Sequence, residues 1–288
     1  MIEDFNKFKE VFEEASKLGK NMKLPKYDKI VFCGIGGSAL PGDVVQSLDL
    51  DLPVFVAREN LPETADDKTL CFIISYSGNT LETIKLYQQA KKKNCKLIVI
   101  TSGGAMRTFK ESKILIPGGY LPREAFLWML LPVLNILGFH YSKKIKIDFD
   151  KIKRFAGRIN KKTPLIYAGS ENLGFLAYRW KTFFEENCKI VASSGFFPEV
   201  NHNEIESRFS REGFQGILIY DNMKDSVKHF EEIVKINFIE VELKGEYFID
   251  KVIYGLYFGF MLSYFLAQNL GVDFKKIDRI KTLKSKLK

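Results

Sequence analysis

The chain has 288 residues, a length that suits one large domain or two ordinary ones. Hydrophobic residues make up 46% of it and charged residues 27%, which is typical of a folded globular protein and excludes an intrinsically disordered one. The net charge of +9 is scattered over amphipathic helices and a lysine-rich tail without a nucleic-acid-binding motif, so we expect a solvated surface and no nucleic-acid partner.

Short apolar strands alternate with helices along the first half of the chain. A first helix is predicted for about Glu3–Leu18, from its apolar spacing. The predicted strands are Lys29–Cys33, Pro53–Val56, Leu70–Ile74 and Lys96–Thr101. Further helices are predicted to open near Ser38, to cover Leu81–Lys93, and to run from Phe126 to about Leu137. Strands this short and continuously apolar predict a parallel sheet covered by helices on both faces.

The second half repeats this alternation after a boundary near 139–148. A helix at about Asp150–Asn160 precedes the first strand of this half, and another helix is expected to run through Glu185. The predicted strands are Leu165–Ala168, Lys189–Ala192, Gly216–Tyr220 and Phe238–Val241. The C-terminal region is expected to be helical, with Val252–Leu270 as a buried helix rather than a membrane span.

Two pairs of segments correspond between the halves. Leu165–Ser170 parallels Ile30–Gly34, and Ile217–Asn222 parallels Phe72–Ser77. We therefore predict an internal duplication within an α/β fold, with domains at 1–145 and 146–288.

The segment after the strand Leu70–Ile74 carries three hydroxyl side chains around a glycine. These are Ser75, Ser77 and Thr80, with Gly78 between them. Ligands of an open α/β sheet bind beyond the carboxyl ends of its strands, and a helix N-terminus attracts anions. Hydroxyls and amides can satisfy phosphate oxygens, and we expect Gly78 to let the backbone approach the ligand. An ordinary helix N-cap is the alternative, but three hydroxyls favour a phosphate site.

Two other turns are interpreted differently. The matching turn of the second half offers Asp221 and Asn222, and a carboxylate there would repel phosphate, so we expect one phosphate site per chain. The glycine-rich turn Gly34–Ser38 follows a strand, as in a dinucleotide-binding site. The Gly-x-Gly-x-x-Gly pattern of such a site requires a third glycine at position 39, where this chain has Ala39, and the next glycine is Gly42. No nicotinamide cofactor is expected.

Cysteine usage and the N-terminus indicate a cytoplasmic protein. The four cysteines lack metal-ligand spacing and are interpreted as reduced residues in or near the core. The first residues, 1–5, are acidic and amphipathic, which is unlike a secretory signal.

Several motifs together resemble the sugar isomerase (SIS) superfamily and, within it, the bifunctional phosphoglucose/phosphomannose isomerases found mainly in archaea. The segments that carry the resemblance are Gly34–Gly42, Ser75–Thr83, Pro122–Phe126, Glu185–Asn187 and Glu199–Glu204. The match extends over nearly the whole chain. It implies two SIS-like subdomains, no cofactor, no metal, and a homodimer. It also implies interconversion of glucose 6-phosphate and fructose 6-phosphate through a cis-enediol. We expect mannose 6-phosphate to react more weakly, because of Gln268.

The resemblance assigns roles to individual residues. Those assigned to substrate binding are Gly36, Gly37, Ser38, Ser75, Ser77 and Thr80. Arg123 stabilises the enediolate, Glu186 is the base, and His202 assists ring opening from across the dimer interface. The residues alone do not distinguish Glu186 from Glu185, since both end an apolar helix expected at the mouth of the sheet.

These residue types suit the chemistry. One carboxylate can carry a proton between C2 and C1 if its pKa is within reach of neutral pH. The guanidinium of Arg123 can stabilise an oxyanion, although an isolated arginine is more often a surface residue. His202 lies in a polar loop, unlike His140 and His229, and can transfer protons near neutral pH. A metal site of His202 with two nearby glutamates is disfavoured because it has a single histidine.

A last motif concerns the range of substrates. Gln268 and Lys275 resemble a glutamine and a lysine, seven residues apart, that line the sugar pocket of ordinary phosphoglucose isomerases. The bifunctional enzymes are expected to carry threonine at the first place, so Gln268 puts mannose 6-phosphate in doubt. Two other functions compete with this one: a sugar-phosphate sensor without catalysis, and an isomerase for another sugar phosphate.

Overall fold

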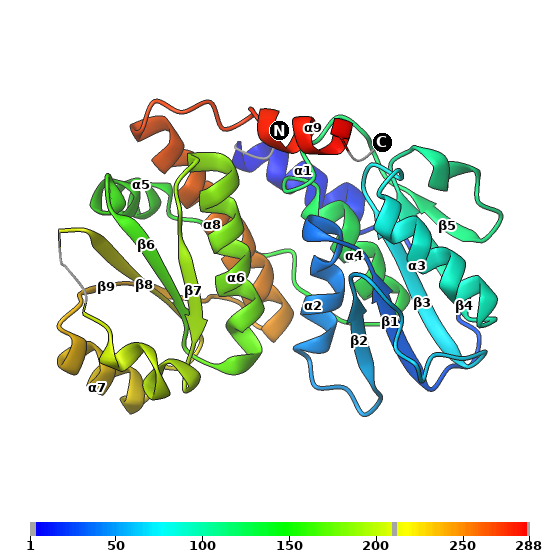
Figure 1. Ribbon diagram of the computed structural model, residues 1–288, viewed down its shortest axis with the longest axis horizontal. Coiled ribbons are helices and arrows are strands. Elements are labelled where there is room, and N and C mark those ends of the chain that lie inside the picture. The colour runs from blue at the N-terminus through cyan, green and yellow to red at the C-terminus, as the bar shows by residue number, and fades with distance from the viewer. Residues whose placement is uncertain (1–3, 209–211, 287–288) are drawn as a thin grey trace. The chain divides into compact units, whose positions relative to one another are not determined.

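The computed structural model describes residues 4–208 and 212–286, and the chain divides into two compact units, Met1–Lys143 and Lys144–Lys288. Each unit is built on one parallel sheet (Figure 1). We call them unit 1 and unit 2.

Unit 1 holds the first five strands. They are β1 (Lys29–Cys33), β2 (Val54–Ala57), β3 (Thr69–Ser75), β4 (Lys96–Thr101) and β5 (Ser112–Leu115). Its helices are α1 (Phe5–Ala15), α2 (Leu40–Gln46), α3 (Leu81–Lys92) and α4 (Phe126–Ile136). The predicted strands and helices are thus confirmed to within a few residues, except that the predicted start of α1 at Glu3 lies outside the described residues. The helix predicted near Ser38 begins at Leu40, after a short 3-10 turn over Gly36–Ser38.

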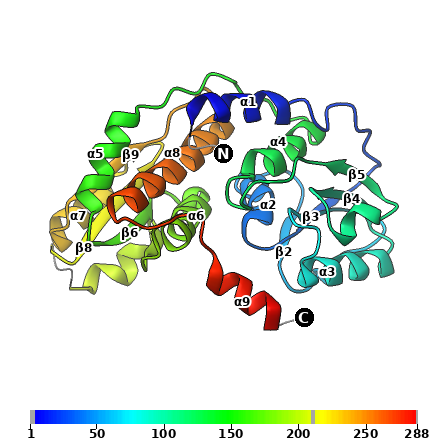
Figure 2. The same cartoon turned by 90° about the horizontal axis from the view of Figure 1, so that it is seen from above.

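The strand order of unit 1 is β2-β1-β3-β4-β5, and every pair is parallel. The crossover from β1 to β2 and the crossover from β3 to β4 therefore run in opposite directions. Since such connections are right-handed, α2 and α3 cover opposite faces of the sheet. Figure 2 shows α3 on one face and α1, α2 and α4 on the other. The β3 strand at the centre is buried along its whole length.

Unit 2 repeats the arrangement with four strands. They are β6 (Thr163–Ala168), β7 (Ser193–Phe196), β8 (Phe214–Tyr220) and β9 (Phe238–Glu242), in the order β7-β6-β8-β9. Its helices are α5 (Phe149–Ile159), α6 (Gly174–Phe183), α7 (Asp225–Val234), α8 (Phe248–Asn269) and α9 (Asp278–Lys286). Strands β7, β6, β8 and β9 occupy the places of β2, β1, β3 and β4, which is the pattern expected of a duplicated fold.

One predicted strand of unit 2 is wrong. The segment Lys189–Ala192 is not a strand, and the edge strand β7 begins only at Ser193. Lys189 has a left-handed backbone (φ 60°), which interrupts an extended run. Val191 is 78% exposed, so its hydrophobicity does not mark a buried strand. Helix α6 itself ends at Phe183, and the helix predicted to run through Glu185 continues as a π-helical turn, Phe184–Cys188.

Helix α8 is long and apolar enough to cross a membrane by length and composition. However, 83% of its most apolar window is buried inside the structure, as in the core helix of a globular fold. It packs against α5 and α6, which confirms the predicted buried helix. The four cysteines are free and buried, as expected from their apolar surroundings.

Candidate functional site

The two polar turns of unit 1 follow neighbouring strands. Gly34–Ser38 follows β1 and Ser75–Thr80 follows β3, and these strands are paired. Because the chain leaves β1 and β3 in opposite directions, the strand order reverses between them. That point, at the carboxyl ends of the strands, is where open α/β sheets leave a crevice for ligands. The sequence-predicted substrate-binding residues of unit 1 therefore meet at the place that the topology favours.

Hydroxyl groups within the second turn contact one another. Ser75 Oγ lies 3.0 Å from Thr80 Oγ1 and accepts a hydrogen bond of 3.1 Å from the Gly78 amide. Ser77 Oγ accepts a longer bond of 3.4 Å from the Asn79 amide. Ser75 is buried, whereas Ser77 is exposed and Thr80 is half-buried. The turn thus presents two accessible hydroxyls above a fixed third one.

Thr80 occupies the N-cap position of α3, yet it does not act as a cap. Within the described part of the chain its side chain makes no capping hydrogen bond to the amides of α3. At α1 and α5, by contrast, the carboxylates of Asp4 and Asp148 accept hydrogen bonds from the first-turn amides. The ordinary-cap alternative therefore does not account for Thr80, and the start of α3 keeps its attraction for an anion.

Gly78 is required by the packing of unit 1 itself. Its backbone is left-handed (φ +69°), a conformation that favours glycine. A Cβ atom at this position would overlap the carbonyl oxygen of Gly103 and lie 2.7 Å from Thr101 Oγ1. The missing side chain thus makes room for the loop that follows β4.

The glycine-rich turn and the Arg123 segment join the same cluster. Ser38 Oγ accepts a hydrogen bond of 3.2 Å from the amide of Tyr76. A Cβ atom at Gly37 would lie 3.0 Å from the carbonyl oxygen of Pro122, so these two backbones approach closely. Arg123 is only 4% exposed, which excludes a surface arginine. Unit 1 therefore brings all three predicted motifs together.

In unit 2, the two candidate glutamates lie in a π-helical turn, Phe184–Cys188, directly after α6. Such turns are rare and often occur at functional sites. Fully buried Asn187 anchors this one, because its Nδ2 donates to Ser263 Oγ of α8 at 2.8 Å. Helix α6 starts at the carboxyl end of β6 and therefore ends at the amino ends of the strands. The expectation that Glu185 and Glu186 lie at the ligand-binding edge of this sheet, at the carboxyl ends of its strands, is thus wrong.

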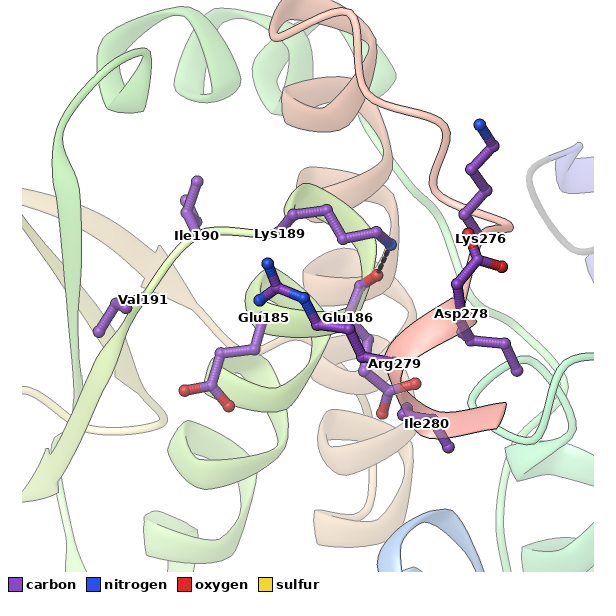
Figure 3. A pocket seen from close by; sticks show the side chains of 10 residues that line it. Glu185, Glu186, Lys189, Ile190, Val191, Lys276, Asp278, Arg279 and Ile280 are labelled. Carbon is purple, nitrogen blue, oxygen red and sulfur yellow. Dashed lines mark hydrogen bonds between the residues drawn. The ribbon is translucent and has the colours of Figure 1, made fainter. Parts of the chain in front are cut away.

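A pocket of about 610 Å³ contains both glutamates (Figure 3). Glu185 is held by Lys181 in an i,i+4 ion pair of 2.7 Å, and the Glu186 carbonyl accepts a hydrogen bond from Lys189 Nζ. The lining residues include acids, bases and aliphatic side chains: Glu185, Glu186, Lys189, Ile190, Val191, Lys276, Ile277, Asp278, Arg279 and Ile280. Charged side chains of both signs therefore border a pocket whose lining is otherwise aliphatic.

The C-terminal part of this lining was missed in the sequence. Lys276 and Arg279 line the pocket beside Glu186, and both are exposed, as is Lys281 of the lysine-rich tail that was interpreted as solvated surface. The C-terminal region was predicted to be helical, and α9 begins at Asp278. The local sequence gives no indication that this helix borders a pocket.

His202 is exposed at the end of a short 3-10 helix rather than in an irregular loop. The residues around it are anchored: Val200 is buried in the core of unit 2, and the Tyr167 hydroxyl donates to Glu204 Oε2 at 2.6 Å. Burial raises the pKa of Tyr167 far above its usual range, so its hydroxyl remains a donor at neutral pH. Among residues 4–208 and 212–286, no three His, Cys, Asp or Glu side chains are grouped to hold a metal ion.

The remaining predicted residues of unit 2 are accounted for by local contacts. Gln268 is exposed and donates from Nε2 to the Tyr264 hydroxyl at 3.0 Å. Lys275 is exposed, with its ammonium 5.7 Å from the ring centroid of Phe274. Neither lines the pocket that contains Glu186.

Asp221, in the turn that matches the phosphate turn of unit 1, forms an ion pair of 2.6 Å with Lys251. A carboxylate bound to a lysine within the fold gives this turn a structural role.

Comparisons with known proteins agree with this fold. Residues 56–117 match the SIS domain, and residues 149–287 match the bacterial phospho-glucose isomerase C-terminal SIS domain. A solved structure of glucosamine-6-phosphate deaminase from Thermotoga maritima superposes with a TM-score of 0.70 at 16% identity. It covers 94% of this chain and 96% of that one, and shows the fold alone.

Curated relatives are similar over most of their length. A bifunctional phosphoglucose/phosphomannose isomerase from Thermoplasma volcanium is 33% identical, with 96% of each chain covered. An enzyme of the same name from Caldicellulosiruptor bescii is 31% identical, with both chains covered in full. A D-glucosamine-6-phosphate 4-epimerase from Sulfolobus acidocaldarius is 35% identical over 75% of each chain.

Proposed function

Because the chain belongs to the family of bifunctional phosphoglucose/phosphomannose isomerases, we propose that it is an aldose–ketose isomerase of hexose 6-phosphates. It interconverts glucose 6-phosphate, and also mannose 6-phosphate, with fructose 6-phosphate, without a cofactor. The observation that carries this proposal is the turn Ser75–Thr80 at the strand-order reversal of unit 1, with a threonine at the N-cap of α3 that does not cap it.

The phosphate group is held by this turn. Ser77 and Thr80 donate their hydroxyls, and Ser38 and Ser75 hold the surrounding backbone through bonds to the Tyr76 and Gly78 amides. The N-terminus of α3 adds its amides and its positive dipole end. In this assignment Gly36 and Gly37 shape the glycine-rich turn beside the phosphate.

Glu186 is the base that transfers the proton. It takes the proton from C2 and returns it to C1, which gives a cis-enediolate between the two steps. Its anchor favours this role, because Asn187, the next residue, is bonded to α8 and fixes the turn. The ion pair of Glu185 with Lys181 gives that neighbour a structural role.

Two further groups complete the reaction. Arg123 stabilises the negative charge of the enediolate, and its burial strengthens that interaction because water screens it less. His202 opens the sugar ring by proton transfer. Its exposure fits a residue that is donated to a second copy of the chain, so we propose a cytoplasmic homodimer.

The proposal that both epimers react is supported by the relatives, whose names include phosphomannose isomerase. Gln268 had suggested that mannose 6-phosphate is a poor substrate, but its amide bonds to Tyr264 and it does not line the pocket with Glu186. We therefore expect both C2 epimers to react. A role of Gln268 or Lys275 in sugar binding stays a prediction.

A second candidate is epimerisation at C4 of an amino-sugar phosphate, because the relative with that name is 35% identical. The two activities differ in the carbon that changes. A 4-epimerase would invert C4 of glucosamine 6-phosphate and leave fructose 6-phosphate unchanged.

The test is to incubate the purified protein with fructose 6-phosphate and to quantify both aldose products by chromatography. Glucosamine 6-phosphate is run in parallel. Glucose 6-phosphate and mannose 6-phosphate appear if the proposal is correct. A changed amino sugar with unchanged fructose 6-phosphate supports the epimerase, and binding without turnover indicates a sugar-phosphate sensor.

A further inference from the structure

The side chain of Tyr76, in the middle of the phosphate turn, reaches a different segment of unit 1. Its hydroxyl donates to the carbonyl oxygen of Pro117 at 3.1 Å and accepts from the amide of Tyr120 at 2.8 Å. The residue is 7% exposed. Burial is the largest cause that raises the pKa of Tyr76, so the hydroxyl stays protonated and keeps its bond to Pro117 at neutral pH.

The backbone of Tyr76 is held separately. Its amide donates to Ser38 Oγ, and its carbonyl oxygen accepts from Ser102, both from the hydroxyl at 2.6 Å and from the amide at 3.1 Å. These three bonds fix the phosphate turn and do not involve the tyrosine hydroxyl. The side chain therefore has a separate role: its hydroxyl binds the segment 117–120.

That segment continues directly into the turn that carries Arg123. The Leu121 amide donates to Glu124 Oε2 at 3.0 Å, and the Glu124 amide donates to the Leu121 carbonyl at 2.8 Å. Arg123 lies inside this closed turn. Only two residues separate Tyr120, whose amide is bound by Tyr76, from Arg123. We therefore expect a loss of the Tyr76 hydrogen bonds to change the position of the Arg123 guanidinium.

We propose that Tyr76 is a positioning residue that couples the phosphate-binding turn to Arg123. Its hydroxyl keeps a constant distance between the group that holds the phosphate and the group that meets the enediolate. Both sides of the hydroxyl are engaged with backbone, so it takes no part in proton transfer. This inference rests on the proposed function for its catalytic consequence.

Tyr76→Phe keeps the ring and removes both hydroxyl bonds. Tyr87→Phe is the matched control, because Tyr87 is 9% exposed in the same unit and its hydroxyl donates to Glu111 Oε1 at 2.7 Å, outside the predicted site. We expect kcat for fructose 6-phosphate to fall about 10- to 100-fold in Tyr76→Phe, as for a small misplacement of a catalytic group. KM should change less than about threefold, because the backbone bonds of the turn remain.

The Tyr87→Phe control should change kcat less than about twofold. A second pair of variants tests the route through Arg123: in an Arg123→Lys background, the additional loss caused by Tyr76→Phe should shrink to less than about threefold. An undiminished loss in that background, or equal kcat values for the two Tyr→Phe variants, overturns the positioning role.

A measurement that needs no turnover separates this inference from the proposed function. Hydrogen–deuterium exchange at the Tyr120 amide should be at least about tenfold faster in Tyr76→Phe than in the wild-type protein or in Tyr87→Phe. If the wild-type protein fails to isomerise fructose 6-phosphate but this amide still loses protection, the proposed function is wrong and the coupling stands. Unchanged protection refutes the coupling whatever the activity.

Discussion

Replacing Gly78 by alanine tests whether the phosphate turn depends on its fit against the loop after β4. The backbone of Gly78 has φ +69°, and an alanine in this left-handed region costs about 1–2 kcal/mol. The new methyl group would also overlap the carbonyl oxygen of Gly103. The Cβ atom has a fixed position on the backbone and its partner is a backbone carbonyl, so no side-chain rotation relieves the overlap and the turn must shift.

The shift has a cost that can be counted from the hydrogen bonds of Gly78. Its amide makes one bifurcated hydrogen bond, shared between Ser75 Oγ and the Ser75 carbonyl oxygen, and its carbonyl oxygen accepts a second hydrogen bond from the Met106 amide. Losing both costs about 2 kcal/mol, at about 1 kcal/mol each. Together with the backbone strain, Gly78→Ala should lower the free energy of unfolding by about 3–4 kcal/mol, measured by urea denaturation followed by circular dichroism.

Gly138→Ala is the control for backbone strain alone. Gly138 has φ +77° in the same unit, but a Cβ atom there would meet nothing within 4 Å. Its cost should stay at about 1–2 kcal/mol. Fructose 6-phosphate at about 100 times its Kd should stabilise Gly138→Ala by about 2.7 kcal/mol and Gly78→Ala by far less. Equal unfolding costs and equal ligand effects for the two variants would refute the reasoning.

Three further outcomes are expected. Glu186→Gln should lower kcat about 10²- to 10⁴-fold and stop exchange of the C2 proton with solvent, whereas Glu185→Gln should change kcat less than about threefold in the same assay; a reversed order would make Glu185 the base. Asn187→Ala should lower the free energy of unfolding by about 2–3 kcal/mol in urea denaturation, because it removes the buried bond to Ser263, and a cost near zero would contradict the anchor. Burial raises the pKa of Cys188 to about 12, so at pH 8 almost no thiolate forms; this thiol should resist a disulfide reagent in the folded protein and react after unfolding, and fast labelling of the native state would contradict its burial.

The sequence predicted unit 1 well because its inner strands β1, β3 and β4 are buried over most of their length. The strands β1 and β4 were predicted with their observed bounds, since continuous apolar runs are flanked by turn residues. The two polar turns follow neighbouring strands, which a parallel sheet brings to one edge. That is why residues far apart in the chain, such as Ser38 and Ser75, could be assigned to one site.

The connection after α6 was less predictable. Lys189–Ala192 contains two β-branched aliphatic residues, which favoured a strand, but the π-helical turn before it ends in a left-handed residue. Strand propensity depends on neighbouring residues only. It contains no information on the hydrogen bond between Asn187 and Ser263 of α8, 76 residues away in the chain. For the same reason, the position of Glu186 at the amino ends of the strands follows only from the path of α6.

The contacts that join motifs could not be predicted at all. Tyr76 stands among hydroxyl residues in the sequence, where it has the appearance of an ordinary apolar neighbour. Its bonds to Pro117 and Tyr120 depend on the packing of two loops, which no local pattern encodes. Arg279 of the Glu186 pocket lies on α9, and no local sequence pattern indicates that this helix borders a pocket.

A structure of the protein with a hexitol 6-phosphate that cannot isomerise tests the central claim most directly. We predict that the phosphate group lies against Ser75–Thr80, within hydrogen-bond distance of the Ser77 and Thr80 hydroxyls and of the first amides of α3. A phosphate bound elsewhere, with that turn empty, would contradict the account.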